Sequence, residues 1–407
     1  MEDDSEKLFH DVDGSRLGGG GQILRVSAAF SALLRKGIRV TNICAGRNPP
    51  GMRMQHLNGL QQVGKLSHGD LQGAYFSSQM FSFLRGELQP SGMDLFIDIQ
   101  TAGSITLLIQ GLLPILLFQP PSSSSSSSSI SASSSLSANA STCSADGSSS
   151  KPSTLTVLGG TNVPEAPQID FFIHVFLPVA ERMFGKGRVR ATVLQRGYFP
   201  KGGGRVLLEV TPLPPGESLK AIDLTELGTM SRIGGYIFVG GSIPQSIGWD
   251  MHKQVVEDLQ LAENVGRERF PQLEKDLRVM VEAAKGGGSG LVIWAETDKE
   301  CVLGGAALGD RKNKGSSIAK EATKMFLKNL SREVCVDEIL QDQLIFFMAL
   351  AKGRSRILTG PLSVRAQVTI WLATELTGVT FDVQELDGQR FLIECDGIGF
   401  SSPLQSL

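Results

Sequence analysis

The stretch RGYFPKGGGRV, residues 196–206, places three consecutive glycines between basic residues and a strand-like run, residues 206–210. Glycine tolerates positive φ and lets the backbone approach a ligand closely, and consecutive backbone N–H groups in such a turn can form a concave anion site. The alternative for a single GGG run is a tight β-turn whose basic residues are only solvated. The stretch therefore predicts a glycine turn and gives these candidates for RNA or phosphate contact: Arg196, Lys201, Gly202, Gly203 and Gly204.

Two further segments are also rich in glycine and basic residues. The first, DGSRLGGGGQILR at residues 13–25, leads into apolar residues at helical spacing, and a helix that starts after a glycine loop favours phosphate binding. The second reads AGRNPPGMRMQHL at residues 45–57. Glycine turns recur at TAGS (101–104) and LGGTN (158–162), again beside strand-like and helical runs. This recurrence indicates internal repetition of a strand–helix unit.

Composition limits the classes of protein that the chain can represent. Its 407 residues suffice for two or more domains. The longest apolar segment, residues 105–118, is too short for a membrane span, and the acidic start of the chain lacks the apolar core of a secretory signal. The net charge of -2 gives no global case for nucleic-acid binding, so any RNA contact must come from a local basic patch. That patch would comprise Arg25, Arg47, Arg53, Arg196, Lys201 and Arg205.

Cysteine and histidine positions argue against a structural metal site or a disulfide framework. The five cysteines form no CxxC pair, and an odd number of dispersed cysteines is typical of a reducing compartment. The histidines are also dispersed, without partners at metal-ligand spacing. His56 lies in one of the glycine-rich blocks, but a structural role is favoured for it. We therefore expect no metal held by a His–Cys cluster.

The order of predicted elements suggests a large domain that is interrupted twice. Residues 122–153 are dominated by serine and cannot bury a core, so we expect a disordered insertion there. From residue 215 the sequence pattern changes. It predicts a strand, then a charged helical segment at 250–267 and a second helical stretch at 272–284. The predicted division is an acidic tail at 1–11, a main domain at 12–121, 154–214 and 291–407, the serine-rich insertion at 122–153 and a small insert domain at 215–290.

These blocks together resemble the RNA 3'-terminal phosphate cyclase family. The likeness continues through APQIDFF (166–172), AETDKECVLGGAALG (295–309) and LQDQLIFFMALAKG (340–353), and it covers nearly the whole chain outside the tail and the serine tract. The resemblance implies an α/β fold, with a large domain of repeated βαβαββ-type units and a small α/β insert domain. It also implies ATP-dependent conversion of an RNA 3'-phosphate to a 2',3'-cyclic phosphate through a histidine–AMP, with a divalent metal, Mg or Mn, neutralising the phosphates.

The resemblance also implies roles for individual residues that match the family's motifs. Residues that would line the phosphate and nucleotide site are Arg25, Arg47, Gln55 and Gln110. Pro167 and Phe171 would form the adenine pocket, and Asp342 would be the acidic residue beside the nucleophile. The alternatives are a surface charge for Arg25, satisfied buried amides for the two glutamines, and packing at a helix start for Pro167 and Phe171.

The nucleophile itself is replaced. The family's histidine falls in the segment GPLSVRAQ, residues 360–367, at the position of Arg365. A guanidinium stays protonated at physiological pH and is no nucleophile, although it can clamp a phosphate. The alternative for Arg365 is a solvated charge in the first turns of a helix. Because an unpaired carboxylate on the apolar helix that carries Asp342 would be costly, we predict an Asp342–Arg365 ion pair.

Three further departures affect ATP handling. Gly18 replaces a glutamate of the family, Cys44 replaces an arginine and Ile339 replaces the tyrosine that packs on adenine. The first hypothesis is therefore a family member that acts on RNA 3' ends, using ATP if active, with weak or absent adenylylation. The second is a catalytically silent RNA-binding or scaffold protein of RNA processing or ribosome biogenesis. A third rests on fold analogy with enolpyruvyl transferases, whose substrate motifs are not found. We expect a nuclear location, with the cytoplasm as a second one, and no secretion.

Overall fold

The computed structural model describes residues 9–18, 20–122, 150–265, 273–309 and 314–402. The predicted disordered insertion falls almost entirely outside these residues, as does most of the predicted acidic tail. The rest of that tail belongs to the fold, because the first strand, β1, starts at Phe9 rather than after residue 11.

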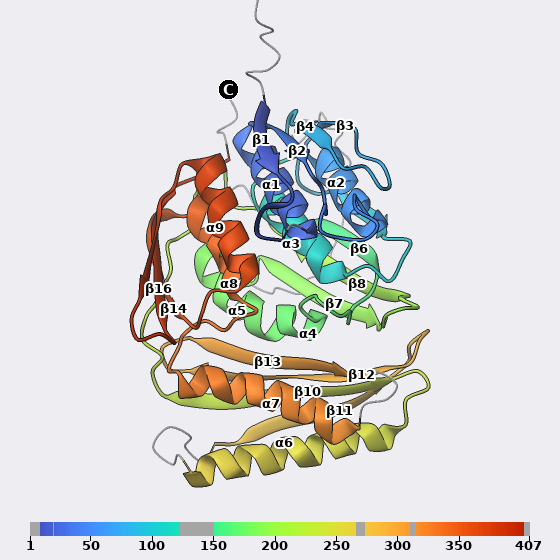
Figure 1. Ribbon diagram of the computed structural model, residues 1–407, viewed down its shortest axis with the longest axis vertical. Coiled ribbons are helices and arrows are strands. Elements are labelled where there is room, and N and C mark those ends of the chain that lie inside the picture. Colours follow the sequence, from blue (N-terminus) through green and yellow to red (C-terminus); the bar gives the residue numbers. More distant parts are fainter. Residues whose placement is uncertain (1–8, 19, 123–149, 266–272, 310–313, 403–407) are drawn as a thin grey trace, which may run out of the picture.

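Within the described residues, three repeats of one βαβαββ pattern form the main body (Figure 1). The first comprises β1 (Phe9–Asp13), α1 (Gly21–Leu34), β2 (Gly37–Thr41), α2 (Met54–Leu66), β3 (Asp70–Gln72) and β4 (Phe81–Leu84). The second comprises β5 (Asp94–Asp98), α3 (Ile105–Leu117), β6 (Ser153–Gly159), a continuous helical segment made of α4 (Ile169–Phe171), a π-helical turn (Phe172–Phe176) and α5 (Leu177–Phe184), then β7 (Val189–Gln195) and β8 (Gly204–Val210). The third comprises β9 (Asp223–Leu224), α8 (Gln341–Leu350), β14 (Lys352–Thr359), α9 (Val364–Thr377), β15 (Phe381–Glu385) and β16 (Phe391–Ile398).

Strand pairing is the same in all three repeats. The sheets have the orders β1-β2-β4-β3, β5-β6-β8-β7 and β9-β14-β16-β15. In each sheet, the two strands that come first in the sequence are parallel and are joined by a helical crossover. The strand that comes last in the sequence lies between two neighbours and is antiparallel to both. The predicted α/β class and the predicted repetition of βαβαββ units are thus confirmed.

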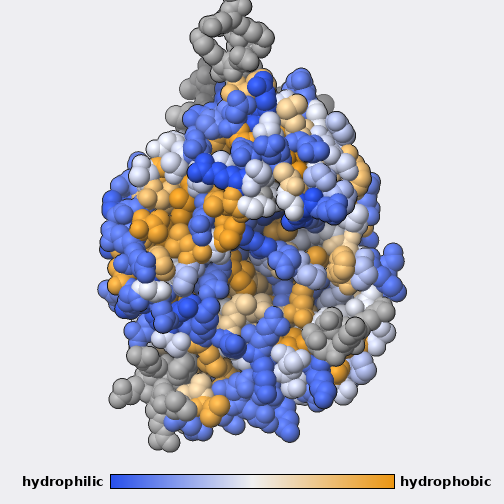
Figure 2. Space-filling model, in the orientation of Figure 1, coloured by the Kyte–Doolittle hydropathy of each residue, from blue (hydrophilic) through white to orange (hydrophobic). Residues whose placement is uncertain are grey.

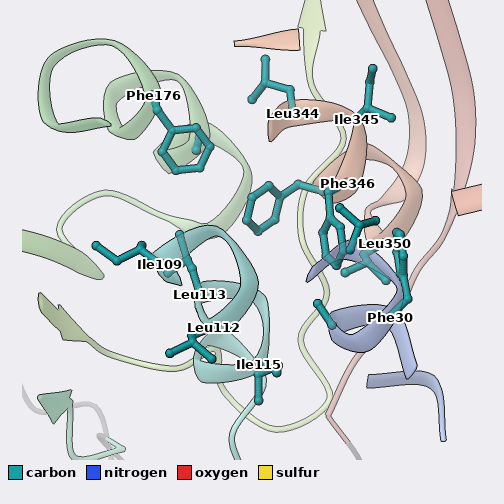
Figure 3. Close-up of a cluster of buried hydrophobic side chains, with 14 of the residues drawn as sticks. Phe30, Ile109, Leu112, Leu113, Ile115, Phe176, Leu344, Ile345, Phe346 and Leu350 are labelled. Atoms are coloured by element: carbon teal, nitrogen blue, oxygen red, sulfur yellow. The ribbon is translucent and has the colours of Figure 1, made fainter. Parts of the chain in front are cut away.

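Helices of the three repeats pack against one another between the sheets. The α3 sequence ITLLIQGLLPILL is apolar on all sides, which suits a helix with no solvent-facing side, and most of it is buried. Every residue of α8 is buried as well. Figure 3 shows the contact between α1 and α8, where the rings of Phe30 and Phe346 stack with centroids 4.0 Å apart. The helices therefore meet in one apolar centre, and their ends are fixed relative to one another.

A fourth sheet interrupts the third repeat between β9 and α8. We call residues 230–331 the insert unit: β10 (Met230–Gly240), α6 (Gln245–Val265), β11 (Lys275–Glu282), β12 (Gly288–Thr297), β13 (Val302–Gly309) and α7 (Gly315–Ser331), with strand order β11-β10-β12-β13. In β12, Leu291 and Ile293 face α6 and α7, while Val292 and Trp294 pack on the main body. Figure 1 shows the sheet between these two helices and the helical segment α4–α5.

Two predictions for this region were wrong. The expected boundary at residue 290 falls inside β12, because β12, β13 and α7 complete the same sheet and core. The helix predicted at 272–284 is instead the edge strand β11, paired in parallel with β10 from Ile233–Lys275 to Gly240–Glu282. Leu277 and Val279, two residues apart, both pack toward the apolar core of the unit. This alternation of inward-facing apolar residues is typical of a strand, and here it outweighs helix propensity. None of the helices in the described ranges combines the length and apolarity that a membrane span requires.

Candidate functional site

A cavity of about 430 Å³ lies where several helices of the main body begin. Its wall includes Gly21 at the start of α1, His56 in the first turn of α2, Ser104 at the N-cap of α3, and Val364 at the start of α9. Helix N-termini carry free backbone N–H groups and the positive end of the helix dipole. Figure 2, in the orientation of Figure 1, shows a hollow in the middle of the molecular surface. The cavity is therefore suited to an anion before any side chain is considered.

Arginines add to this positive potential. Arg25 and Arg47, which the resemblance implies for the phosphate and nucleotide site, line the cavity together with Arg365, and among the described lining residues Glu165 is the one acidic side chain. Arg47 is exposed and has no ion pair with any residue that the structure describes. The Nη2 of Arg365 donates to the carbonyl oxygen of Glu165 and so fastens α9 to the loop 162–166. The excess of cations leaves a charge that an anionic ligand would balance.

Arg25 is the most unusual of these cations. Arg25 is half-buried with its Nε fully enclosed, yet its bonds are long: Nη1 donates to the Gly21 carbonyl at 3.4 Å and Nη2 to Gln110 Oε1 at 3.3 Å. Its Nε has no hydrogen-bond partner. Burial lowers the pKa of Arg25 to about 10, although the nearby Asp342 opposes this shift and Arg365 adds to it. A cation with an enclosed, unused donor is costly in the protein alone, and an anion in the cavity would offset that cost.

Asp342 lies behind the cavity and is buried. Its Oδ2 accepts from Gln22 Nε2 at 3.0 Å. Burial raises the pKa of Asp342, against the opposing effects of Arg365, Arg25 and the bond from Gln22. The predicted Asp342–Arg365 ion pair is wrong: no such pair occurs within 4.0 Å among the described residues. Arg365 extends toward the Glu165 carbonyl instead, and the amide of Gln22 takes the place expected for it.

His56 is a cavity residue that the sequence did not single out for function. The backbone N–H of Arg53 donates to His56 Nδ1 at 3.3 Å, which places the proton of a neutral ring on Nε2. Burial, together with Arg25, Arg47 and Arg53, lowers the pKa of His56 to about 4, so the ring is neutral at pH 7. The ring lies so close to Gly21 that a Cβ added there would be 2.4 Å from Nε2. His56 Nε2 therefore lies beside the start of α1, with the side-chain amide of Gln55 3.5 Å away.

The structure divides the remaining residues of the predicted nucleotide site. Gln55 lines the cavity. Gln110 lies with Arg25 and Asp342 in a small space of about 30 Å³ behind it. Pro167 and Phe171 are not among the lining residues. Phe171 is buried against β13 beside Gly304, and the Pro167 carbonyl accepts from Thr106 Oγ1 at 2.6 Å.

Arg196 requires a correction. It was expected to contact phosphate, but it is 4% exposed and its donors are occupied within the protein. Two of its nitrogens donate to Asp170 at 2.6 and 2.8 Å, and Nε donates to Glu282 of β11. These ion pairs raise the pKa of Arg196 despite the opposing effect of burial. Arg196 thus fixes the second repeat to the insert unit.

The glycine turn beside Arg196 has the predicted backbone form. Gly202 and Gly203 have φ of 59° and 77°, and Gly204 begins β8. Lys201 is exposed at the edge of a second cavity of about 370 Å³ between the second repeat and the insert unit.

The other positions of departure do not line the first cavity in the part of the chain that is described. Gly18 is exposed in a short 3-10 turn (Arg16–Gly18), Cys44 is a buried free thiol, and Ile339 packs on the core. The donor set also does not fit a divalent cation held by the protein. Glu165 is the one carboxylate among the described lining residues, and Asp342 Oδ2 accepts from Gln22.

Comparison with known proteins gives a consistent result. A family model described as RNA 3'-terminal phosphate cyclase matches residues 16–383. An RNA 3'-terminal phosphate cyclase of Pyrobaculum aerophilum is 33% identical over 393 residues, which cover 96% of this chain and 99% of that protein. A protein of the same name from Drosophila melanogaster is 32% identical over 404 residues, with 98% and 99% covered. A probable RNA 3'-terminal phosphate cyclase of Dictyostelium discoideum is 32% identical over 408 residues, with 97% and 84% covered.

Proposed function

This chain belongs to the RNA 3'-terminal phosphate cyclase family, and from that premise we propose that its larger cavity binds the terminal phosphate of an RNA 3' end. We call this cavity the phosphate cavity. The observation that carries the proposal is the half-buried Arg25, whose Nε has no partner, set among the starts of four helices. A phosphate monoester carries close to two negative charges and several acceptor oxygens, so it would balance the charge of Arg25 and accept from the free N–H groups at the helix starts.

Each cationic group would have a separate role in holding the phosphate. Arg25 would supply a desolvated charge from behind, and Arg47 a second charge from the exposed rim. The Nε2–H of His56 and the backbone N–H groups at the start of α1 would donate hydrogen bonds. Arg365 would act as a clamp from α9, because a guanidinium can donate two parallel bonds to a phosphate.

Covalent chemistry at this site would lack a nucleophile. In the reaction that the family resemblance implies, a histidine attacks the α-phosphate of ATP, and Arg365 stands at its position. The attacking atom must have a free electron pair, which a guanidinium lacks. His56 would not substitute for it, since its Nδ1 is engaged by Arg53 and its Nε2 carries the proton. We therefore propose that the chain recognises phosphorylated RNA ends without forming a nucleotidyl-enzyme.

ATP remains part of the proposal as a ligand, because the same donors suit the phosphates of a nucleotide. A divalent metal would enter with those phosphates. We further propose a role as an RNA-binding factor in RNA processing, with a nuclear location. The family's ATP-dependent cyclisation is the competing outcome.

Labelling with ATP separates the two outcomes. Purified protein is incubated with α-labelled ATP and Mg²⁺ or Mn²⁺, with and without a 3'-phosphorylated RNA. We expect no acid-labile AMP on the protein and no cyclic ends, but tighter binding of RNA that ends in a 3'-phosphate than of RNA that ends in a 3'-hydroxyl. Labelled protein with cyclic product would establish a working cyclase. Equal binding of both RNA ends would contradict the proposed phosphate recognition.

A further inference from the structure

The second cavity, of about 370 Å³, is formed by the second repeat and the insert unit together, and we call it the boundary cavity. From the second repeat come Asn162 and Pro164 after β6, and the turn 198–201 between β7 and β8. From the insert unit come Ile243 and the turn 286–289 before β12. Its volume lies within the roughly 300–1,000 Å³ of sites that accept small molecules.

Ion pairs and close packing hold the walls of the boundary cavity in a fixed position. Arg196, just before the turn of the second repeat, pairs with Glu282 at the end of β11, and its backbone bridges to Ala284. Tyr198 is buried against Gly288, where a Cβ would lie 2.1 Å from the ring. The cavity is therefore part of a rigid junction between the two bodies.

Lys201 and the exposed ring of Phe199 line the boundary cavity, and Lys285 immediately precedes its lining turn at Gly286. Lys201 and Lys285 are exposed and have no ion pair with any described residue. The aliphatic part of Lys201 packs over Gly286, and that of Lys285 over Gly203, so each lysine lies on the opposite turn. Phe199 lies beside Lys201 and is 60% exposed. The carboxylate of Glu282, three residues before Lys285 in the sequence, pairs with Arg196 rather than with either lysine.

Position relates the boundary cavity to the phosphate cavity. Pro164 lines both, and the loop 162–166 is the wall between them. The same loop is fastened from the other side by Arg365, which donates to the Glu165 carbonyl. An RNA strand whose 3' end lies in the phosphate cavity would therefore cross only this loop to reach Lys201.

An exposed aromatic ring next to unpaired cations is the arrangement that binds single-stranded nucleic acid, in which the base stacks and the lysines hold the backbone phosphates. We propose that the boundary cavity binds a nucleotide on the 5' side of the terminal one, with its base on Phe199 and its phosphate between Lys201 and Lys285. This inference rests on the proposed function and deepens it, since it turns recognition of a phosphate into recognition of a strand.

Binding assays with RNA of different length test this inference. The probes are a single uridine 3'-phosphate, a five-nucleotide uridine RNA with a 3'-phosphate and the same RNA with a 3'-hydroxyl. Wild-type protein should bind the five-nucleotide 3'-phosphate RNA more tightly than the mononucleotide. Phe199→Ala should weaken binding of the longer RNA roughly tenfold and leave the mononucleotide affinity unchanged. Lys201→Ala should lower the salt dependence of the longer RNA by about 0.7 in the log–log slope.

Matched controls and distinct outcomes separate the two proposals. Phe96→Ala, an exposed ring on β5, and Lys186→Ala, at the far end of β7 from the turn, should change none of these affinities. Equal affinity of the mononucleotide and the longer RNA, or an unchanged affinity in Phe199→Ala, overturns the boundary site and leaves the phosphate cavity intact. Equal affinity of the 3'-phosphate and 3'-hydroxyl RNAs overturns the proposed function, and a loss in Phe199→Ala would then locate RNA binding at the boundary cavity alone.

Discussion

Gln22 donates its amide Nε2 to Asp342 Oδ2 at 3.0 Å and so occupies the carboxylate oxygen that Arg365 was expected to hold. The same Nε2 is 2.8 Å from Thr369 Oγ1 and 3.2 Å from the Arg365 carbonyl. One amide of α1 thereby joins α8 to α9 behind the phosphate cavity. The side chain of Arg365 reaches the Glu165 carbonyl instead.

This bond predicts the effect of removing Gln22. Gln22→Ala leaves the buried Asp342 without its side-chain donor, so we expect the free energy of unfolding to fall by about 1–3 kcal/mol. Urea unfolding followed by circular dichroism measures this change. Gln61→Ala, on the exposed side of α2, is the control and should lie within about 0.5 kcal/mol of wild type. Equal values for the two variants would show that the bond contributes nothing.

Arg365→His tests whether the lost nucleophile explains the expected lack of adenylylation. A neutral imidazole at this position has a free electron pair, so we expect acid-labile AMP on the variant after incubation with α-labelled ATP. Arg365→Lys, which keeps the charge on a flexible side chain, should remain unlabelled. If Arg365→His binds the nucleotide and stays unlabelled, the prediction is wrong and other departures, such as Cys44, also prevent the reaction.

The low pKa of His56 predicts a pH dependence of stability. The ordinary pKa of histidine is 6.5, whereas burial and three arginines lower it to about 4 in the folded state. As pH falls from about 6.5 to about 4, the unfolded chain gains a proton that the folded chain does not, so stability decreases by up to about 3 kcal/mol. His56→Gln should lack this component between those pH values, whereas the control His252→Gln should retain it.

Titration by NMR gives an independent test at the same residue. The ring of His56 should titrate near pH 4 in the free protein, and its pKa should rise when inorganic phosphate occupies the cavity, because a nearby anion favours the imidazolium. A His56 resonance that titrates near 6.5 in the free protein would contradict the buried, arginine-flanked position.

Arg196 should affect stability more than ligand binding. Arg196→Ala leaves the carboxylates of Asp170 and Glu282 unpaired in a buried place, and breaking such a pair costs about 3–5 kcal/mol. Arg205→Ala, an exposed arginine at the start of β8, should change stability by less than about 0.5 kcal/mol. The free energy of unfolding of both variants decides between this role and the phosphate contact first expected for Arg196.

Much of the main body could be predicted from periodicity and glycine turns. The helix α1 follows its glycine loop as predicted, and the strand β8 and the helix α6 overlap the predicted segments 206–210 and 250–267. The strand β13 was missed because its sequence VLGGAALG has little strand propensity. Its Gly304 and Gly305 are explained only by packing, since a Cβ at either would lie under 3 Å from Phe171 or from α7. The need for glycine at these positions comes from the tertiary structure, so no local pattern in the sequence predicts it.

The sequence pointed to the cationic residues that line the cavity, but not to the hydrogen bonds around it. Arg25, Arg47, Gln55 and Arg365 line the cavity, and their types already suggested phosphate. The roles of Gln22 and His56 depend on contacts between helices far apart in the sequence, and their only signal was their place at helix starts. Arg196 looked like a surface cation because its partners, Asp170 and Glu282, come from distant elements.

Insertion of residues 230–331 into the third repeat sets an order of folding. The short strand β9 pairs with β14 through Asp223–Arg356 and Leu224–Ile357, and the whole insert unit lies between these two partners in the sequence. Closing so long a loop carries a large entropic cost while its interior is unstructured. The insert unit pairs its strands with one another and has its own apolar core, so it can form first and bring β9 and β14 together. The third repeat, and with it the α9 wall of the phosphate cavity, would then be the last part of the protein to assemble.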